Sequence, residues 1–381
     1  MKGKYLFSFI TLLFLLSGCV EPKQIEQLAI INARGVDQLK QTSDKLIETT
    51  LVIFQFDTQT NDITKIATGT GKTIKEARHH ADSKTSFTLS PGQIRLELYG
   101  MDTAKSGISP YLNTLYRDAR TTDRVMLAIT DKTAKEVLTT GQEVTKINVG
   151  LFINGLIKQK ITNDMIPKAE LNDFTHAFYE KGRDPVLPLI TTDDGVPALT
   201  GAALFKGDTF VGKLSLRQAL YINLILKKIK APSFNIGVPE EPLKNYVQEE
   251  LSENENEDIY LNGQILSGKD RTKLMDKDKL TFQTDITIEM NILELSKELE
   301  LENEKVVEKL EKEIGNQVER EYEKLLEATQ EMGADPFGYG EIYRIHKKNG
   351  KLKKGEWHKL YPDIKVNFNA NIKIVEYGAI R

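Results

Sequence analysis

Hydrophobic and polar residues alternate almost without interruption near the end of the chain. Between Leu280 and Ile292 one parity is apolar and the other polar. The apolar set is Leu280, Phe282, Ile286, Ile288, Met290 and Ile292. This period of two predicts a long antiparallel strand with one face in water. A second alternating strand closes the chain, with apolar residues at Ile364, Val366, Phe368, Ala370, Ile372 and Ile374.

Between these two strands the apolar spacing widens to three or four residues. The apolar positions are Leu299, Val306, Leu310, Ile314, Val318, Tyr322 and Leu325, with Glu and Lys filling most other places. This spacing predicts a long amphipathic helix, from about Val306 to Leu326, whose apolar stripe lies on the sheet. Gly333 suits the end of such a helix. We therefore predict that residues 271–381 form a C-terminal antiparallel sheet covered by a long amphipathic helix.

The first half of the chain mixes shorter strand and helix signals. The strand candidates are Leu28 to Val36, Thr50 to Phe56 and Arg124 to Thr130, and the helix candidates begin at Thr73 and Lys132. Because strands and helices interleave, we predict a mixed α/β domain over residues 19–195. The whole chain is therefore expected to be α+β, with several domains.

Turn residues cluster between Pro185 and Pro197, and we place a domain boundary after residue 195. Residues 196–270 are predicted to form a middle subdomain, which begins with a hairpin turning at Gly207. A helix capped by Ser215 follows it. The acidic segment from Glu249 to Asp258 is a surface loop or a short exposed helix, and either a solvated charge run or a partner contact.

The start of the chain carries a targeting signal over residues 1–18. Lys2 and Lys4 precede an apolar segment that is too short to span a bilayer. The segment closes with Leu16, Ser17, Gly18 and Cys19, which resembles a bacterial lipobox. We predict that Cys19 receives lipid and becomes the first residue of the mature chain. The alternative is an ordinary secretory signal beside an unrelated cysteine.

Composition limits the remaining possibilities. Cys19 is the only cysteine, so the rest of the chain has no thiol for a disulfide, a zinc cluster or a nucleophile. The hydrophobic share of 40% and the charged share of 28% are ordinary for a globular protein. The net charge is −3, and removal of Lys2 and Lys4 makes it −5 (−3 − 2). An acidic body is repelled by nucleic acid and by anionic lipid, so we expect the acyl anchor rather than a basic patch to provide membrane contact.

We find no group of residues in the sequence that would carry catalysis, and we expect no catalytic residue, metal site or cofactor. The run from Gly69 to Thr73 imitates a phosphate-binding loop but lacks the first glycine, because Ile66 stands there. We expect a glycine turn with Thr73 as a helix cap. His79 and His80 are adjacent rather than three or four residues apart, which favours solvated side chains over metal ligands.

The segment from Asp335 to Gly340 allows two interpretations. The first is structural, with Pro336 fixing a turn, glycines allowing positive φ and Asp335 bonding to nearby amides. The second is a contact surface for a protein partner, formed by Asp335, Pro336, Phe337, Gly338, Tyr339 and Trp357. In that case the aromatic residues would serve as anchors. Trp357, the only tryptophan, belongs to the core or to a subunit interface.

Several segments together resemble the Ger(x)C family of spore germinant receptor C-subunit lipoproteins. They are Gly201 to Leu214, Asp335 to Gly340, Trp357, Tyr361-Pro362 and the final strand. The front of the chain is similar too, with the lipobox, then Ile25 to Ile31 and Gly35-Val36-Asp37. One departure is Val20-Glu21, where the family usually has Trp-Asp after the lipidated cysteine.

This resemblance implies a non-enzymatic protein on the outer face of the spore inner membrane. Residues 19–195 would be its N-terminal germination-protein domain. It would work with membrane-embedded A and B subunits to sense nutrients such as amino acids or sugars, and whether it binds the nutrient directly stays open. Two alternatives remain. A solute-binding lipoprotein of a membrane transporter would show two similar lobes, and an anchored hydrolase would need a nucleophile or metal cluster.

Overall fold

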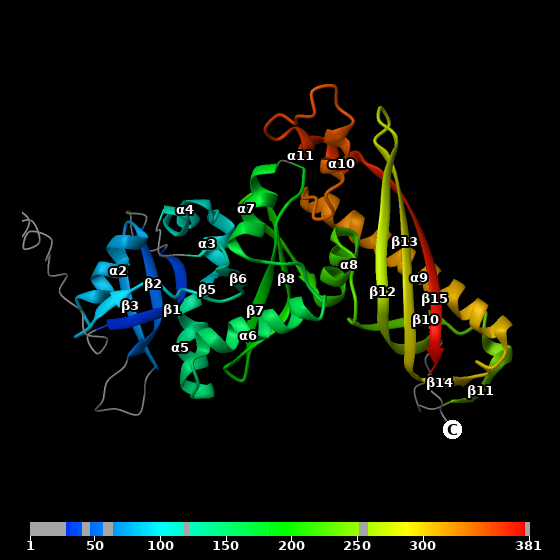
Figure 1. Cartoon of the computed structure of the whole chain (residues 1–381), viewed down its shortest axis with the longest axis horizontal. Helices are drawn as coiled ribbons and strands as arrows, with labels where there is room; N and C mark the ends of the chain where they lie inside the picture. The colour runs from blue at the N-terminus through cyan, green and yellow to red at the C-terminus, as the bar shows by residue number, and fades with distance from the viewer. Residues whose placement is uncertain are drawn as a thin grey trace, which may run out of the picture.

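The computed structural model describes residues 28–39, 46–55, 64–117, 122–180, 182–250 and 258–377. It is elongated, with one large sheet in its N-terminal half and a smaller sheet at its C-terminal end (Figure 1). The lipobox and most of the acidic segment after Glu250 lie outside the described residues. None of the described helices combines enough length and hydrophobicity to cross a bilayer.

The large sheet has the strand order β3-β2-β1-β5-β6-β7-β8-β9, with β4 paired to β1. Its centre is parallel, from β1 through β5 and β6 to β7, and both edges are antiparallel. The strands are β1 (Leu28–Leu39), β2 (Leu46–Gln55), β3 (Thr64–Gly71), β4 (Thr88–Ser90), β5 (Leu96–Tyr99), β6 (Met126–Thr130), β7 (Val186–Asp193), β8 (Val196–Lys206) and β9 (Thr209–Ser215). The mixed α/β prediction for this half is confirmed.

Helices cover this sheet and connect its strands (Figure 1). They are α2 (Ile74–Asp82), α3 (Met101–Ser106), α4 (Ser109–Arg117), α5 (Ala134–Thr145), α6 (Val149–Thr162), α7 (Leu171–Glu180) and α8 (Leu216–Leu226). Several begin at a residue whose side chain accepts a hydrogen bond from the first turn, such as Thr73, Thr133 and Ser215. Such caps satisfy amides that have no partner inside the helix.

The predicted boundary after residue 195 falls in the tight turn between β7 and β8. Asp194 and Gly195 both have positive φ there, and the two strands pair antiparallel. The turn residues therefore make a hairpin rather than a linker. The predicted middle subdomain is divided as a result, because β8 and β9 belong to the large sheet.

The smaller sheet has the order β10-β12-β13-β15, and β11 pairs separately with β14. The strands are β10 (Ser233–Pro239), β11 (Val247–Glu250), β12 (Asp258–Asp276), β13 (Thr281–Leu295), β14 (Lys297–Leu299) and β15 (Lys365–Tyr377). Between them lie the 3-10 turns η2 (Lys244–Tyr246) and η3 (Tyr361–Asp363), and the helices α9 (Glu304–Met332), α10 (Tyr339–Ile345) and α11 (Glu356–Leu360). Leu299 lies in β14, before the helix.

Helix α9 covers one face of this sheet, as its apolar stripe predicted. Leu310 and Tyr322 are fully buried, and the Tyr322 ring stacks on Phe368 of β15 with 5.2 Å between centroids. The Tyr322 hydroxyl also donates to the Tyr221 carbonyl oxygen at 2.9 Å, which ties α9 to α8. The helix ends at Gly333 with φ of 65°, in the left-handed region that glycine favours.

The expectation of an all-antiparallel C-terminal sheet is wrong for its last strand. The β10, β12 and β13 strands are antiparallel, but β15 runs parallel to β13. The reason is the connection, because α9 carries the chain back along the sheet before β15 begins. A strand that follows such a crossover has the same direction as the strand before it.

Candidate functional site

The Asp335 turn is organised by its buried carboxylate. Asp335 Oδ1 accepts from the amides of Phe337 and Gly338, each at 2.9 Å. Its Oδ2 accepts from the Gly340 amide at 3.0 Å and from Trp357 Nε1 at 2.8 Å. The predicted turn chemistry is confirmed, and the structure brings Trp357 to the same carboxylate.

The side chains of this turn lie in the core. Phe337 is 4% exposed, Tyr339 1% and Trp357 4%, and Asp335 is fully buried. Phe282 of β13 contacts both the Tyr339 and the Trp357 rings. The prediction of a partner contact surface is therefore wrong for these side chains, since a surface anchor must be exposed before the partner binds. A buried carboxylate needs several hydrogen-bond donors, and the amides of the turn and the Trp357 indole supply them to Asp335 inside the protein.

Asp184, between α7 and β7, joins the Asp335 turn to the N-terminal half. The backbones of Asp184 and Asp335 are hydrogen-bonded, with the Asp184 amide donating to the Asp335 carbonyl oxygen at 2.6 Å. The Asp184 carboxylate then accepts from the Asp335 amide at 2.9 Å and from the Gly207 amide at 2.8 Å. His358 Nε2 lies 2.9 Å from the same carboxylate. One side chain thus holds the α7–β7 loop, the β8–β9 turn and the C-terminal segment together.

Asp184 was not predictable from the sequence pattern. Its partner Asp335 is 151 residues away, and Asp184 shares no local motif with it. The signal present was Asp184-Pro185, a pair typical of turns, which says nothing of distant partners.

Burial is the main electrostatic feature of Asp335. It raises the pKa of the carboxyl group to about 7, and the nearby Asp184 carboxylate also raises it. The hydrogen bonds from Gly340 and Trp357 act in the opposite direction. The group can therefore exchange a proton near neutral pH while it remains inside the protein.

A cavity of about 360 Å³ adjoins this junction. Aromatic residues Phe178, Tyr179 and Trp357 line it, together with Arg183, Lys353 and Lys354. A second cavity of about 280 Å³ shares Arg183 and Asp184 with it. A volume of this size would admit a small molecule, and the cationic lining would favour an anionic group.

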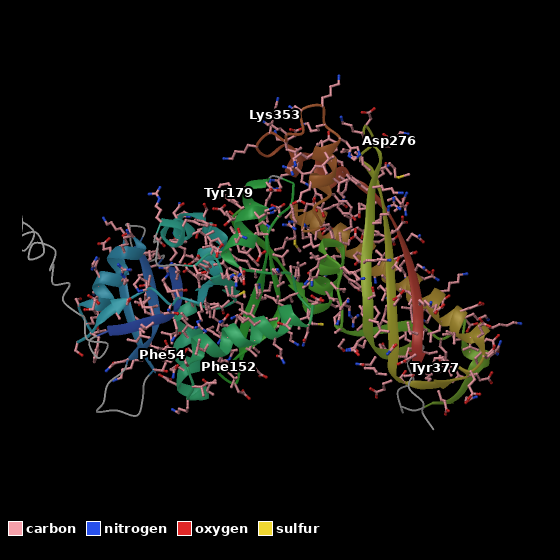
Figure 2. All side chains as sticks on the ribbon, viewed as in Figure 1. Phe54, Phe152, Tyr179, Asp276, Lys353 and Tyr377 are labelled. Carbon is pink, nitrogen blue, oxygen red and sulfur yellow. The ribbon has the colours of Figure 1, made fainter. Side chains whose placement is uncertain are left out.

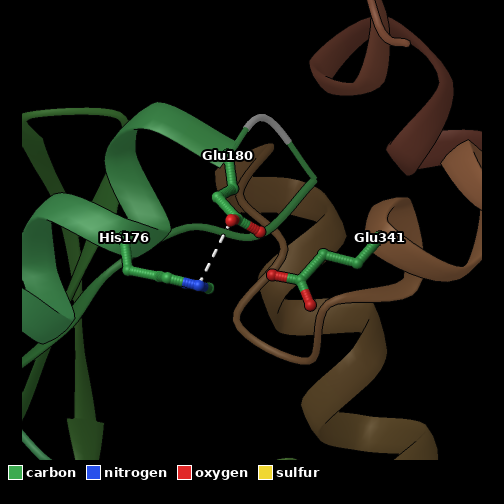
Figure 3. A group of neighbouring side chains, drawn as sticks. All are labelled: His176, Glu180 and Glu341. Atoms are coloured by element: carbon green, nitrogen blue, oxygen red, sulfur yellow. Dashed lines mark ion pairs between the residues drawn. The ribbon is translucent and has the colours of Figure 1, made fainter. Parts of the chain in front are cut away.

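His176, Glu180 and Glu341 converge beside the junction, with His176 and Glu180 on α7 and Glu341 on α10 (Figure 3). These residue types can ligate a metal, but the contacts here are ion pairs. His176 Nε2 lies 3.2 Å from Glu180, while Arg183 and Arg344 lie 3.5 and 3.6 Å from Glu341 and Glu180. The two guanidinium groups would repel a divalent cation, so the cluster supports no metal site. The spacing of four between His176 and Glu180 can be read from the sequence. The approach of Glu341 to these two residues cannot, because it depends on the tertiary fold.

The segment that imitates a phosphate-binding loop has a packing role. Thr73 caps α2 as predicted, accepting from the Glu76 amide at 3.1 Å. Gly69 and Gly71 lie in β3 rather than in a turn, which corrects the expected glycine turn. A Cβ on Gly69 would come within 2.0 Å of the Ala77 carbonyl oxygen, so glycine is needed for α2 to approach the strand.

Comparison with known proteins matches two family models to consecutive parts of the chain. Residues 21–192 match the spore germination protein N-terminal domain, and residues 200–378 match the C-terminal domain described as spore germination B3/GerAC like. The division between these matches falls near the predicted boundary.

Similar proteins cover nearly the whole chain. Spore germination protein GerQC of Bacillus cereus is 23% identical over 371 residues, which cover 97% of this chain and 98% of that protein. The putative spore germination protein YfkR of Bacillus subtilis (strain 168) is 20% identical over 383 residues, covering 96% and 94%. The crystal structure of the GerBC protein has a TM-score of 0.56 at 16% identity, covering 90% of this chain and 97% of that chain, and it supports the fold.

The two matched domains and the shared fold define a spore germination protein. More particularly, the chain belongs to the germinant receptor C-subunit family, Ger(x)C, as its sequence segments indicated.

Proposed function

We propose that this protein is the lipid-anchored C subunit of a spore nutrient germinant receptor. It is held on the outer face of the spore inner membrane by Cys19 and assembles with membrane-embedded A and B subunits. The observation that carries the proposal is the pair of family matches, over residues 21–192 and 200–378, the first of which begins two residues after Cys19. The family supplies the receptor role, and the lipobox supplies the anchor.

A non-enzymatic role is the second part of the proposal. The acidic groups buried in the described region are held by structural donors, as Asp335 is by three amides and the Trp357 indole. Such a carboxylate is not placed to act on a substrate. The transporter alternative gains no support, because the two described modules differ in strand number and strand order instead of forming two similar lobes.

The anchor is tested by labelling cells with a fatty acid analogue. We expect the wild-type protein to be labelled and membrane-bound, and Cys19→Ala to be unlabelled and soluble, because the thiol is the attachment point. Ser17→Ala keeps a small residue before the cleavage site and is the matched control. Equal labelling of wild type and Cys19→Ala would refute the anchor.

Assembly is tested by pull-down of the tagged protein from solubilised spore inner membrane. We expect the A and B subunits to be recovered with the wild-type protein. Their absence from a pull-down that still yields folded, labelled protein would refute the subunit assignment while leaving the anchor intact.

A further inference from the structure

A segment before the last strand carries a concentration of positive charge that the net charge conceals. Residues 344–359 contain seven Lys or Arg residues and one glutamate, Glu356, which gives a net charge of +6 (seven minus one). The whole chain carries −3, so the remainder carries −9 (−3 − 6). The protein is therefore an acidic body with one strongly basic segment.

The structure exposes most of these cations on one projecting part of the molecule. Lys348, Lys351, Lys353, Lys354 and Lys359 are exposed, and we call these five the basic surface. Two other cations are engaged, because Lys347 pairs with Glu356 and Arg344 lies 3.6 Å from Glu180. The loop that bears four of these lysines rises above α10 and α11, with Lys353 at its outer side, and the fifth, Lys359, lies in α11 (Figure 2).

The tip of the β12–β13 hairpin lies beside this loop. Lys277 Nζ donates to the His346 carbonyl oxygen at 3.1 Å, which fixes the hairpin tip against the segment. Figure 2 shows Asp276 at the tip, projecting to the same side as Lys353. The hairpin therefore extends the same exposed side.

Two apolar side chains are exposed among these charges. Ile345, the last residue of α10, is 74% exposed, and Met275 near the hairpin tip is 62% exposed. Exposed apolar side chains close in sequence to lysines are typical of segments that bind at a bilayer surface, where cations meet head groups and apolar groups enter the interface. Lysine also suits a diffuse anionic surface, since it acts as a point charge without the paired geometry that arginine gives.

We propose that the basic surface docks onto an anionic phospholipid bilayer, with Ile345 and Met275 entering the interface. Each lysine near such a surface contributes about 1 kcal/mol. This proposal differs from the expectation that only the acyl anchor provides membrane contact, because that expectation used the net charge of the whole body.

The proposal deepens the function proposed above and rests on its lipid anchor at Cys19. Cys19 precedes the first described strand by nine residues. A lipid on Cys19 attaches the protein to the membrane at one point. A second contact through the basic surface fixes which side of the body faces the bilayer, and so which sides remain open to the partner subunits.

The test uses the whole mature chain with Cys19→Ala, which contains every described residue and has no acyl chain. Flotation is measured with vesicles of equal parts phosphatidylglycerol and phosphatidylcholine, and with pure phosphatidylcholine vesicles. We expect binding to the anionic vesicles alone, and loss of binding in concentrated salt because exposed charges are screened. Lys353→Glu/Lys354→Glu should lower the partition coefficient by at least about 30-fold, since two cations are removed and two anions take their places.

The matched control is Lys75→Glu/Lys158→Glu, which makes the same change in net charge at exposed lysines of α2 and α6. We expect it to change the partition coefficient less than threefold, and thermal unfolding to show that both variants are folded. Equal binding to both vesicle types, or an equal loss in the control, would overturn the proposal. So would a Lys353→Glu/Lys354→Glu variant that still floats but no longer recovers A and B subunits, because an acidic protein would then occupy the surface. Fatty-acid labelling of Cys19 is independent of all these outcomes.

Discussion

Two buried carboxylates, one in each half of the molecule, are stabilised in different ways. Glu97 of β5 faces a cation, because Arg34 of β1 donates to its Oε2 from Nη2 at 2.6 Å and from Nε at 3.0 Å. The Tyr99 hydroxyl donates to the other oxygen at 2.8 Å. Asp335 instead receives its hydrogen bonds from three amides and an indole. Burial raises the pKa of both groups.

The difference concerns what each carboxylate organises. Glu97 and Arg34 lie opposite each other on two neighbouring strands of one sheet. Their ion pair therefore compensates a buried charge between strands that are already paired through their backbones. Asp335 shapes a turn, and its backbone pairs with Asp184 to connect the two halves. A cation compensates charge, whereas amides also fix the path of the chain.

The largest expected effect follows from removing the cation from Glu97. Arg34→Met leaves a buried carboxylate without its partner, and we expect a loss of about 3 to 5 kcal/mol in the free energy of unfolding. Chemical denaturation measures this. In the control Arg34→Met/Glu97→Gln the buried charge is also gone, so most of the loss should be recovered. An Arg34→Met variant as stable as wild type would show that the ion pair does not stabilise the buried Glu97 carboxylate.

A somewhat smaller effect is expected at the turn. Asp335→Ala leaves four donors without their acceptor, and we expect a loss of about 3 kcal/mol, limited by water that enters the site. Because the turn connects the two halves, limited proteolysis should cut near residue 184 faster than in wild type. Asp363→Ala, an exposed aspartate of the same region, is the control and should stay within about 0.5 kcal/mol of wild type. Unchanged proteolysis in Asp335→Ala would show that this turn does not hold the junction between the two halves.

The smallest of the three effects is a pH dependence. The Asp335 pKa is about 7 in the folded protein and about 3.9 in the unfolded chain, so between these values the folded state binds the extra proton. Its contribution to stability is complete below the unfolded pKa and is lost as pH rises through 7. Between pH 5 and 7 we expect a loss of roughly 2 kcal/mol in wild type that Asp335→Ala lacks. Parallel pH profiles for the two proteins would contradict this.

Local patterns predicted much of the C-terminal module. The apolar stripe through Leu310 and Tyr322 gave α9 because a helix repeats every 3.6 residues, and alternation gave β13 and β15. The helix caps at Thr73 and Ser215 were predictable for the same reason, since each cap bonds within its own first turn. The Asp335 turn was predicted from its residues, but the burial of its side chains was not predicted.

The sequence by itself determined the family, the long helix and strands of the C-terminal module, and the chemistry of the Asp335 turn, because each depends on residues close together in the chain or on a motif preserved in order. Only the tertiary structure decided which sides of these elements became core. It buried Phe337, joined Asp184 to Asp335 across 151 residues, and made β15 parallel to β13 through the crossover of α9. It also left most of the lysines of residues 344–359 exposed. These outcomes depend on which distant groups meet, and burial and electrostatic energies are set by those neighbours rather than by sequence spacing.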